Sequence, residues 1–334
     1  MSPDAAQSDS EMKAIKRILD FEPKAEDFAG AVIAGLSSDP KSIPPKFFYD
    51  QRGSDIFNRI CETEEYYVTR TEVALLAEIG PEVGQLAGAG VSVIEYGCGS
   101  SDKIRALLDA LSSPAEYWAI DISRAHLLQS AGEIGLDYPD LSVNAVCADF
   151  TGGLELPEEM AGRRLAFFPG STIGNQTPGE AEAFLTGVRG MVGDAGALLI
   201  GVDLIKDTDR LNRAYNDAAG HTADFNINLL CRMQVELGAE LDLDGFRHRA
   251  FFNAEKSRIE MHLLSSRAQT IRVAGREFKF AEGETIHTEN SYKYDIPGFA
   301  GLAGRAGFDV TKSWTDAEQL FAIHFLDAAP GAGG

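Results

Sequence analysis

The chain has 334 residues, 44% of them hydrophobic and 24% charged, which is enough for one large core or two smaller ones. Its formal net charge of −21 disfavours nucleic acid and anionic membranes as partners, because both would be repelled. No stretch approaches the ~20 apolar residues of a membrane-spanning helix, and the acidic N-terminus has no signal-peptide pattern. We expect a cytoplasmic monomer that binds neither nucleic acid nor membrane and acts on a small zwitterionic or cationic molecule.

The N-terminal segment is predicted to be largely helical. Residues 1–18 are polar and predict a mobile arm or at most a short helix, whereas residues 21–36 have the apolar spacing of a helix. Pro44 and Pro45 then force an extended path, so the aromatic triplet at 47–49 has to pack against another part of the chain.

A second aromatic loop, at residues 65–72, leads into a helix that we expect to reach Ile79. Its two tyrosines, Tyr66 and Tyr67, have two interpretations. Loop tyrosines commonly pack with a hydrogen-bonded hydroxyl, and the alternative is that they line a ligand pocket.

A strand, a glycine turn and a helix indicate a nucleotide-binding α/β domain. Residues 91–96 form an apolar β-branched run, Gly97 and Gly99 let the backbone turn, and residues 103–111 have helical spacing. A dinucleotide fingerprint would have a third glycine where this chain has Asp102, whose carboxylate would repel a pyrophosphate at the helix N-terminus. The loop therefore favours S-adenosylmethionine, which has no phosphate, over NAD.

Cysteine and histidine spacing predicts neither a disulfide framework nor a metal site. The four cysteines include no CxxC pair, and the six histidines show no HxH or HxxxH spacing. For Cys98, in the glycine turn, a small loop residue is the simpler interpretation and a redox-sensitive thiol is the alternative.

The next two predicted strands are each followed by an acid. The strand near 117–122 contains Asp121, where a carboxylate can accept both ribose hydroxyls or cap the next helix; we prefer the ribose role. The strand at 142–147 is followed by Asp149 and Phe150, and an acid beside a ring suits an adenine base.

The fourth predicted strand, 164–168, runs into a loop that ends at Asn175. Ligands of doubly wound sheets bind at the carboxyl ends of the strands, so this loop lies where the reacting group should be. The Asn175 amide can accept a hydrogen bond from an amine and orient its lone pair, or it can cap a turn; local pattern does not separate the two.

A large insertion follows the fifth predicted strand, 197–204. Residues 206–244 look helical, and residues 246–294 alternate with period two, which predicts antiparallel hairpins. A helix and two strands then complete the sheet, near 297–306, 308–311 and 320–326. We expect the insertion and the N-terminal aromatic loops to form a lid over the cofactor.

Four stretches together resemble one family, the histidine-specific Nα-methyltransferases, which make hercynine (histidine betaine) in the first step toward ergothioneine. They are residues 44–50, 65–72, 170–175 and 203–207. The resemblance runs from about Leu19 to Leu326. It implies S-adenosylmethionine-dependent trimethylation of the α-amine of L-histidine, with release of S-adenosylhomocysteine.

The resemblance also implies an α/β fold, a Rossmann-like class I methyltransferase domain with an inserted α+β substrate-binding domain. On this interpretation residues 72–203 and 296–327 form the methyltransferase domain, and residues 19–71 and 204–295 form the substrate domain.

Family positions that match Tyr66, Asn175 and Tyr215 hold the amino-acid backbone of the substrate. The tyrosine that matches Tyr49 positions the amine together with Asn175, and Gly170 lies against the same group. The resemblance thus implies Tyr49 and Asn175 as the catalytic pair.

The cofactor site implied by the resemblance consists of Gly97, Lys103, Asp121, Asp149 and Phe150. Lys103 would pair with the methionine carboxylate of S-adenosylmethionine.

For the imidazole ring, the resemblance implies Glu289 and Ser291, with Met261 packed beside it. These two polar residues are two apart in a predicted strand and therefore share a face. A carboxylate can accept from one ring N–H while a hydroxyl serves the other nitrogen. The alternative is a solvated pair on an edge strand, and Asn290 between them departs from the family pattern, which leaves fine substrate preference open.

Three rival functions follow from the same residues. They are an Nα-methyltransferase for another aromatic amino acid, a non-catalytic protein that binds S-adenosylmethionine, and a nicotinamide-dependent dehydrogenase.

Overall fold

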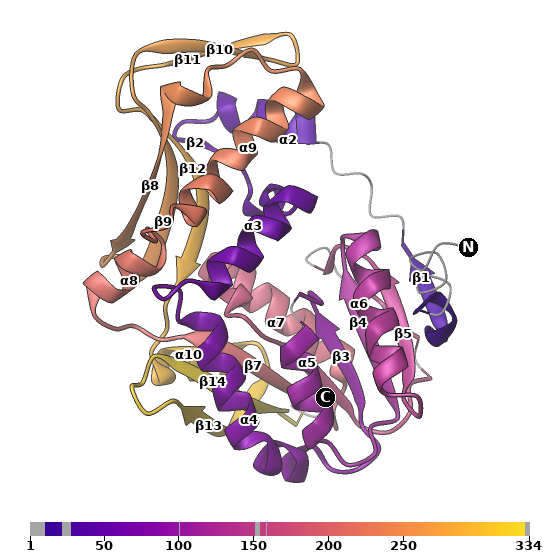
Figure 1. Cartoon of the computed structure of the whole chain (residues 1–334). Helices are drawn as coiled ribbons and strands as arrows, with labels where there is room; N and C mark the ends of the chain where they lie inside the picture. Colours follow the sequence, from indigo (N-terminus) through magenta and orange to yellow (C-terminus); the bar gives the residue numbers. More distant parts are fainter. Residues whose placement is uncertain (1–10, 22–27, 100, 151–153, 158, 331–334) are drawn as a thin grey trace.

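The computed structural model describes residues 11–21, 28–99, 101–150, 154–157 and 159–330 of the chain (Figure 1). Its lower part in Figure 1 is a large twisted sheet covered by helices, and its upper part is a smaller sheet with α2 and α9 beside it. None of the helices in these ranges is long and apolar enough to cross a membrane.

The large sheet has eight strands in the order β1-β5-β4-β3-β6-β7-β14-β13. Their bounds are β1 Arg17–Asp20, β3 Ser92–Tyr96, β4 Glu116–Asp121, β5 Ser142–Cys147, β6 Arg164–Phe168, β7 Ala197–Asp203, β13 Phe308–Thr315 and β14 Phe321–Ala328. The strands from β1 to β7 pair in parallel, and β14 is antiparallel to both of its neighbours. The chain reverses its direction of winding between β3 and β6, which is where open α/β sheets bind ligands. The predicted Rossmann-like fold class is confirmed.

Helices cover both faces of this sheet. On one face lie α4 (Val68–Ala87), α5 (Ser101–Ala110) and α6 (Arg124–Asp137), and on the other lie α7 (Pro178–Val192) and α10 (Ile296–Arg305). The strands β3 and β7 are buried at every residue, as expected for strands packed on both faces.

The prediction of a mobile arm or short helix for residues 1–18 was wrong for residues 17 and 18. Residues 11–14 form a helical turn, but residues 17–20 form β1, which extends the sheet by pairing with β5. Three of its four side chains are exposed, so β1 has no apolar alternation by which sequence could reveal it. The predicted helix at 21–36 is confirmed as α2 (Phe28–Ser37); Phe21 is not helical, and 22–27 lie outside the described residues.

The helix α4 continues beyond the predicted end at Ile79, through Pro81, to Ala87. Its apolar face packs on α5 and β14, and this burial outweighs the hydrogen bond that the proline cannot donate. A Cβ on Gly84 would lie 2.3 Å from the carbonyl oxygen of Ala110, so glycine is needed where the two helices meet.

The insertion supplies three of the four strands of the smaller sheet, as the period-two alternation predicted, and the N-terminal segment supplies the fourth. The four strands are ordered β2-β12-β9-β8, and a separate hairpin pairs β10 with β11. Their bounds are β2 Lys41–Ser42, β8 Phe246–Asn253, β9 Arg258–Ser265, β10 Gln269–Val273, β11 Arg276–Phe280 and β12 Thr285–Tyr292. The helices α8 (Thr208–Ala214) and α9 (His221–Leu237) and the short η4 (Leu243–Gly245) precede β8, and α9 packs on β8, β9 and the N-terminal α3 (Gln51–Glu62).

Candidate active site

Tyr49 stands at a rigid junction between η1 (Pro45–Phe48) and α3. The Asp50 carboxylate caps α3 by accepting from the backbone N–H of Gly53 at 2.7 Å, and it also accepts from Asn228 of α9 at 2.8 Å. A Cβ on Gly53 would lie 1.7 Å from the carbonyl oxygen of Phe48, so only glycine permits this turn. These constraints fix the backbone on both sides of Tyr49.

The Tyr49 side chain packs against two aromatic rings. Its ring packs edge-on against Phe57 and Phe225, at centroid distances of 5.7 and 5.6 Å. Burial and the nearby Glu289 carboxylate raise the pKa of its hydroxyl, yet the residue is 40% exposed. In the described part of the chain the Tyr49 hydroxyl has no hydrogen-bond partner, so it is available to a ligand.

The two tyrosines of the second aromatic loop differ in role. The Tyr67 hydroxyl donates to the buried Asp203 carboxylate, so the packing interpretation holds for it. The Tyr66 ring instead packs edge-on against Tyr215 at 6.3 Å, and its hydroxyl has no partner among the described residues. Arg70 holds the loop by donating to the backbone carbonyls of residues 63, 64 and 66.

Glu289 and Ser291 lie on one buried face of β12, as their spacing predicted. The register pairs His287 with His262 but Glu289 with Met261, so Thr288 is the extra residue of a β-bulge. Regular alternation would place Glu289 on the outer face with His287; the bulge turns it to the inner face.

The Glu289 carboxylate is buried and has no hydrogen-bond partner in the part of the chain that the structure describes. Burial raises the pKa of this carboxyl to about 7, although the Lys293 ammonium nearby acts in the opposite direction. Its charge also raises the pKa of Tyr49, Tyr66 and Tyr215, so all three hydroxyls lie near the Glu289 carboxylate. Met261 is buried directly across from Glu289 on β9.

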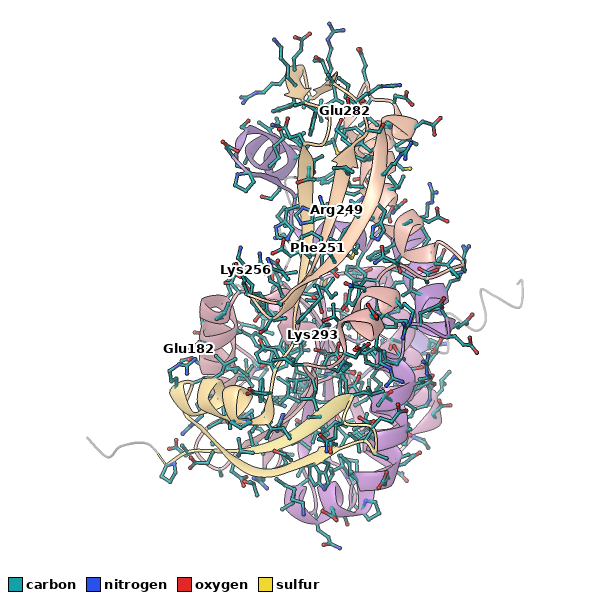
Figure 2. The ribbon with its side chains drawn as sticks, turned by 90° about the vertical axis from the view of Figure 1, so that its left-hand side faces the viewer. Glu182, Arg249, Phe251, Lys256, Glu282 and Lys293 are labelled. Atoms are coloured by element: carbon teal, nitrogen blue, oxygen red, sulfur yellow. The ribbon has the colours of Figure 1, made fainter. Side chains whose placement is uncertain are left out.

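A buried ionic network contacts Ser291 and Tyr215, and no role was predicted for its members from the sequence. The Asp203 carboxylate, fully buried at the end of β7, accepts from Lys206 and lies 2.7 Å from Lys293 Nζ. Lys293 Nζ also donates to the hydroxyls of Ser291 and Tyr215, at 2.8 and 3.1 Å. Figure 2 shows Lys293 where the chain of the small sheet enters the larger part of the molecule.

Asn175 ends the short η3 (Thr172–Asn175), which packs against β12. Ser171, before this turn, has the left-handed φ of 54° that non-glycine residues seldom adopt, and its hydroxyl accepts from the backbone N–H of Asp203 at 2.9 Å. A Cβ on Gly174 would lie 2.8 Å from the carbonyl oxygen of Tyr292. The loop is therefore held tightly under the strand that carries Glu289 and Ser291.

Lys103 and Gly170 meet through a residue that the sequence analysis missed, Glu72. This buried carboxylate lies 2.6 Å from Lys103 Nζ and accepts from the Gly170 backbone N–H at 2.9 Å. Gly170 has a φ of +83°, and a Cβ there would lie 3.3 Å from Lys103 Nζ. A Cβ on Gly201 would strike Glu72 itself, at 2.1 Å. Glu72 thus joins the predicted cofactor lysine to the predicted substrate loop.

The remaining predicted cofactor residues lie at the carboxyl ends of β3, β4 and β5. Gly97 has a φ of +79°, and a Cβ there would have no atom closer than Phe150, at 4.0 Å. The Phe150 ring packs edge-on against Tyr96 at 5.7 Å. Asp121, at the end of β4, accepts from the backbone N–H of Ser123 at 2.8 Å, but the N-cap of α6 is Ser123, so the alternative role of Asp121 as a helix cap is wrong.

A protein-family comparison decides the interpretation of this arrangement. The model of S-adenosylmethionine-dependent, histidine-specific methyltransferases matches residues 28–328. The chain belongs to this family.

Relatives of this histidine-specific methyltransferase agree with the match. A histidine N-alpha-methyltransferase of Mycolicibacterium smegmatis is 42% identical over 305 residues, covering 90% of this chain and 94% of that protein. The protein of the same name from Mycobacterium tuberculosis is 41% identical over 298 residues, with coverages of 87% and 92%. The ergothioneine biosynthesis protein 1 of Neurospora crassa is 28% identical over 307 residues, which are 86% of this chain and 33% of that protein.

The methyltransferase also has three potential metal ligands on the outer face of its small sheet. Glu260, His262 and His287 offer ligand atoms within 4.8 Å of one another. The two imidazole rings are stacked with centroids 4.8 Å apart and an interplanar angle of 24°, so their in-plane lone pairs lie in two nearly parallel planes. The Glu260 carboxylate already accepts from Arg258 at 2.6 Å. We assign no metal to this group.

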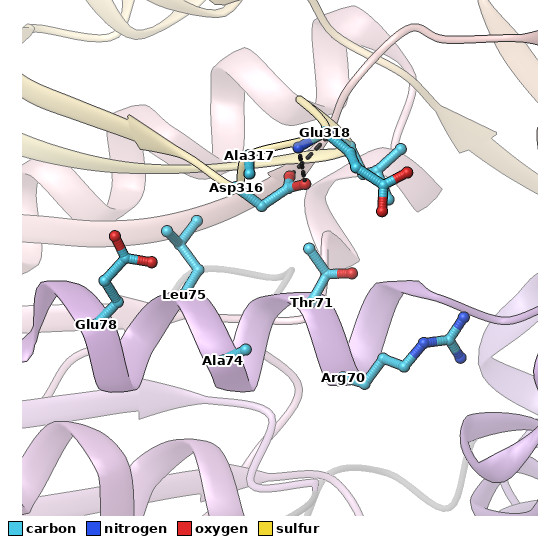
Figure 3. A pocket seen from close by; sticks show the side chains of 9 residues that line it. Arg70, Thr71, Ala74, Leu75, Glu78, Asp316, Ala317 and Glu318 are labelled. Carbon is cyan, nitrogen blue, oxygen red and sulfur yellow. Dashed lines mark hydrogen bonds between the residues drawn. The ribbon is translucent and has the colours of Figure 1, made fainter.

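A pocket of about 350 Å³ lies away from the predicted site residues, between α4 and the segment that precedes β14 (Figure 3). Arg70, Glu78, Asp316 and Glu318 line it. The Asp316 carboxylate is engaged in the loop itself, accepting from the backbone N–H groups of residues 318, 320 and 321. None of the predicted cofactor or substrate residues lines this pocket.

Proposed function

We propose that this enzyme transfers three methyl groups from S-adenosylmethionine to the α-amine of L-histidine, giving hercynine in the first step of ergothioneine biosynthesis. The family match supports the methyl donor and the amino acid. The observation that carries the proposal is the buried pair Glu289 and Ser291 near the hydroxyls of Tyr49 and Tyr66, which have no hydrogen-bond partner among the described residues.

In the proposed complex, Glu289 accepts from one ring N–H of histidine and Ser291 serves the other nitrogen, with Met261 packed beside the ring. A buried carboxylate without a partner is costly, and a ring N–H would satisfy it. Tyr66, Tyr215 and Asn175 would hold the backbone of the amino acid. The same polar groups would penalise a ring that lacks the two nitrogens.

The residues proposed to hold S-adenosylmethionine fit that molecule. Lys103 is a buried cation suited to its methionine carboxylate, and the space in front of Gly97 would admit the ligand close to the backbone. Asp121 would accept from the ribose hydroxyls, and Asp149 and Phe150 would contact the adenine. When bound, S-adenosylmethionine supplies a methyl group already activated by the positive charge on sulfur.

The protein's contribution is then mainly alignment and desolvation. Tyr49 and Asn175 would aim the lone pair of the amine, with Gly170 against it. Because burial raises the pKa of Tyr49, its hydroxyl stays protonated and acts as a dipole rather than as a base. The rings of Tyr49, Phe57 and Phe225 would tolerate the permanent cation that the last methylation leaves.

We further propose that residues 19–71 and 204–295 act together as the substrate domain, over a methyltransferase domain of residues 72–203 and 296–327. Supporting contacts are the packing of α3 on α9 and the pairing of β2 with β12. Residues 19 and 20 are the exception, because they belong to β1 in the large sheet.

One incubation tests the function. The enzyme is mixed with S-adenosylmethionine and equal amounts of histidine, tryptophan and tyrosine, and the products are followed by mass spectrometry. We expect mono-, di- and trimethylated histidine to appear in turn, with the other amino acids unchanged. Methylation of tryptophan or tyrosine in preference to histidine would contradict the proposed substrate, and absence of any methylated product would contradict catalysis.

A further inference from the structure

Lys293 is a buried cation whose three N–H donors all have partners. Its side chain is 1% exposed, and Nζ lies 2.7 Å from Asp203, 2.8 Å from Ser291 Oγ and 3.1 Å from Tyr215 Oη. An ammonium group has three donors and no acceptor. Both hydroxyl oxygens therefore accept a hydrogen bond from Lys293.

The Tyr215 and Ser291 hydroxyls also bond to each other, at 2.8 Å. A phenol is more acidic than an aliphatic alcohol, so it is the better donor and the poorer acceptor. Tyr215 therefore donates to Ser291, and its remaining lone pair can accept from the α-amine of the substrate. Ser291 Oγ then has both lone pairs occupied, one by Lys293 and one by Tyr215, and only its O–H remains free.

This free O–H is the hydrogen-bonding group that Ser291 can offer a ligand. On the same face of β12, the Glu289 carboxylate can only accept while it is ionised. One donor and one acceptor match a neutral imidazole, which has one bare nitrogen and one N–H. A protonated ring would direct an N–H at the O–H of Ser291.

We propose that Lys293 is a positioning residue that turns Ser291 into a donor, so that the site selects the neutral imidazole of histidine over its protonated form. This inference rests on the proposed histidine site. It assigns Lys293 a role in specificity that neither its charge nor its ion pair with Asp203 would require.

Several ionisable groups face this site and would also affect the pH dependence of binding. They come from β12 and the residue after it, β7 and its following loop, the end of α8 and the two aromatic loops: Glu289, Lys293, Asp203, Lys206, Tyr215, Tyr49, Tyr66 and Tyr67. Comparing two ligands of the same shape in the same protein cancels most of their effect.

The test measures the Kd of histidine and of β-(1,2,4-triazol-3-yl)alanine by calorimetry, with the enzyme saturated with S-adenosylhomocysteine. The triazole has a bare nitrogen and an N–H but stays neutral from about pH 5 to pH 8, whereas imidazole has a pKa of about 6.5. We expect the ratio of the histidine Kd to the triazole Kd to rise about tenfold from about pH 7.5 to about pH 5.5. A ratio that stays constant or falls would overturn the inference.

A pair of variants tests the role of Lys293 itself. In Lys293→Met, Ser291 regains a free lone pair that can accept from a protonated ring, so the ratio should change less than about threefold over the same range. The matched control Lys206→Met removes the other lysine of Asp203 but leaves Lys293 on Ser291, and it should keep the tenfold change. A tenfold change in Lys293→Met would overturn the role of Lys293.

The proposed histidine site and the proposed selection of the neutral ring would be contradicted by different results. If neither ligand binds, the proposed histidine site is wrong. If both bind with a ratio independent of pH, the site stands and the selection of the neutral ring is wrong. The measurement on the unmodified enzyme remains decisive for that selection even if Lys293→Met does not fold.

Discussion

Tyr49 is the clearest case of a site residue whose neighbours hold it firmly while its hydroxyl makes no hydrogen bond to the described residues. Its backbone is fixed by the Asp50 cap and the Gly53 turn, and its ring by Phe57 and Phe225. A hydroxyl held this firmly, with no hydrogen-bond partner in the described ranges, is available to a ligand.

Tyr49→Phe should therefore lower kcat by roughly 10- to 100-fold, because the amine loses one of the two groups that aim it. The Kd of S-adenosylmethionine should change less than about twofold, since Tyr49 lies outside the proposed cofactor residues. Steady-state kinetics and calorimetry measure both. Tyr138→Phe, which removes a hydroxyl that binds Asp109 on the surface, serves as the control and should keep the parent kcat. An unchanged kcat in Tyr49→Phe would remove Tyr49 from the chemistry.

Glu289→Ala should raise the Kd of histidine by roughly 10- to 100-fold, the usual loss for a hydrogen bond to a charged group. It should also bring the Kd of other aromatic amino acids closer to that of histidine, because their rings would no longer leave the Glu289 carboxylate without a hydrogen bond. Calorimetry with the three amino acids checks both effects. Histidine affinity equal to that of the parent enzyme would refute the assignment of Glu289 to the ring.

The sequence predicted site residues that lie in short family motifs. It did not predict residues whose role depends on partners brought close by the fold. Glu289 and Ser291 could be placed on one face from their spacing alone. Glu72 and Lys293 could not be assigned, because their partners Gly170 and Asp203 are distant in sequence. Each looks like an ordinary surface charge until the strands bring the partner to it.

Among the structural elements, the bulge in β12 decides where the proposed ring contacts point. Thr288, the inserted residue, bonds through its hydroxyl to the Asn226 side chain at 2.9 Å and to the Met261 carbonyl at 3.1 Å. Both partners lie on elements packed against β12. The hydroxyl thus anchors the irregularity that turns Glu289 inward.

Thr288→Val keeps the shape of the side chain but removes these hydrogen bonds. We expect the Kd of histidine to rise about 5- to 20-fold, because the bulge loosens, while the Kd of S-adenosylhomocysteine stays the same. Thr285→Val, earlier on the same strand, is the matched control and should leave both Kd values unchanged. Equal weakening of both ligands in Thr288→Val would indicate general destabilisation and contradict a local effect.

The ends of helices and strands could be predicted where a run of apolar residues is followed directly by residues typical of a turn. The strands at 142–147 and 164–168 have the predicted ends. The sequence signal failed where packing overrode it, since the helix predicted to end at Ile79 continues to Ala87. It also failed where backbone pairing alone makes a strand, as in β1, and no local pattern foretells the bulge at Thr288.

For the molecule as a whole, pH should affect stability through a carboxyl group buried in the centre of the large sheet. Glu95 of β3 is 1% exposed and accepts from the Tyr117 hydroxyl at 2.5 Å. Burial raises the pKa of Glu95 to about 8, whereas an unfolded glutamate has a pKa of about 4.3. The folded state thus favours the protonated form. The resulting stabilisation is complete below about pH 4 and is lost as the pH rises through about 8.

Glu95→Gln resembles the protonated form at every pH. Its Tm advantage over the parent enzyme should therefore be larger near pH 9 than near pH 6, by roughly 2–4 °C, as thermal unfolding at the two pH values would show. The same Tm difference at both values would mean that Glu95 does not titrate in this range.

The central claim is that Glu289 and Ser291 bind the imidazole ring while Tyr49 and Asn175 present the α-amine to the methyl donor. A crystal structure of the enzyme with histidine and S-adenosylhomocysteine tests it most directly. We predict one ring nitrogen within hydrogen-bond distance of the Glu289 carboxylate, the other at Ser291 Oγ, and the amine facing the sulfur from beside Tyr49. A ring bound elsewhere, with Glu289 and Ser291 not contacting it, would contradict the account.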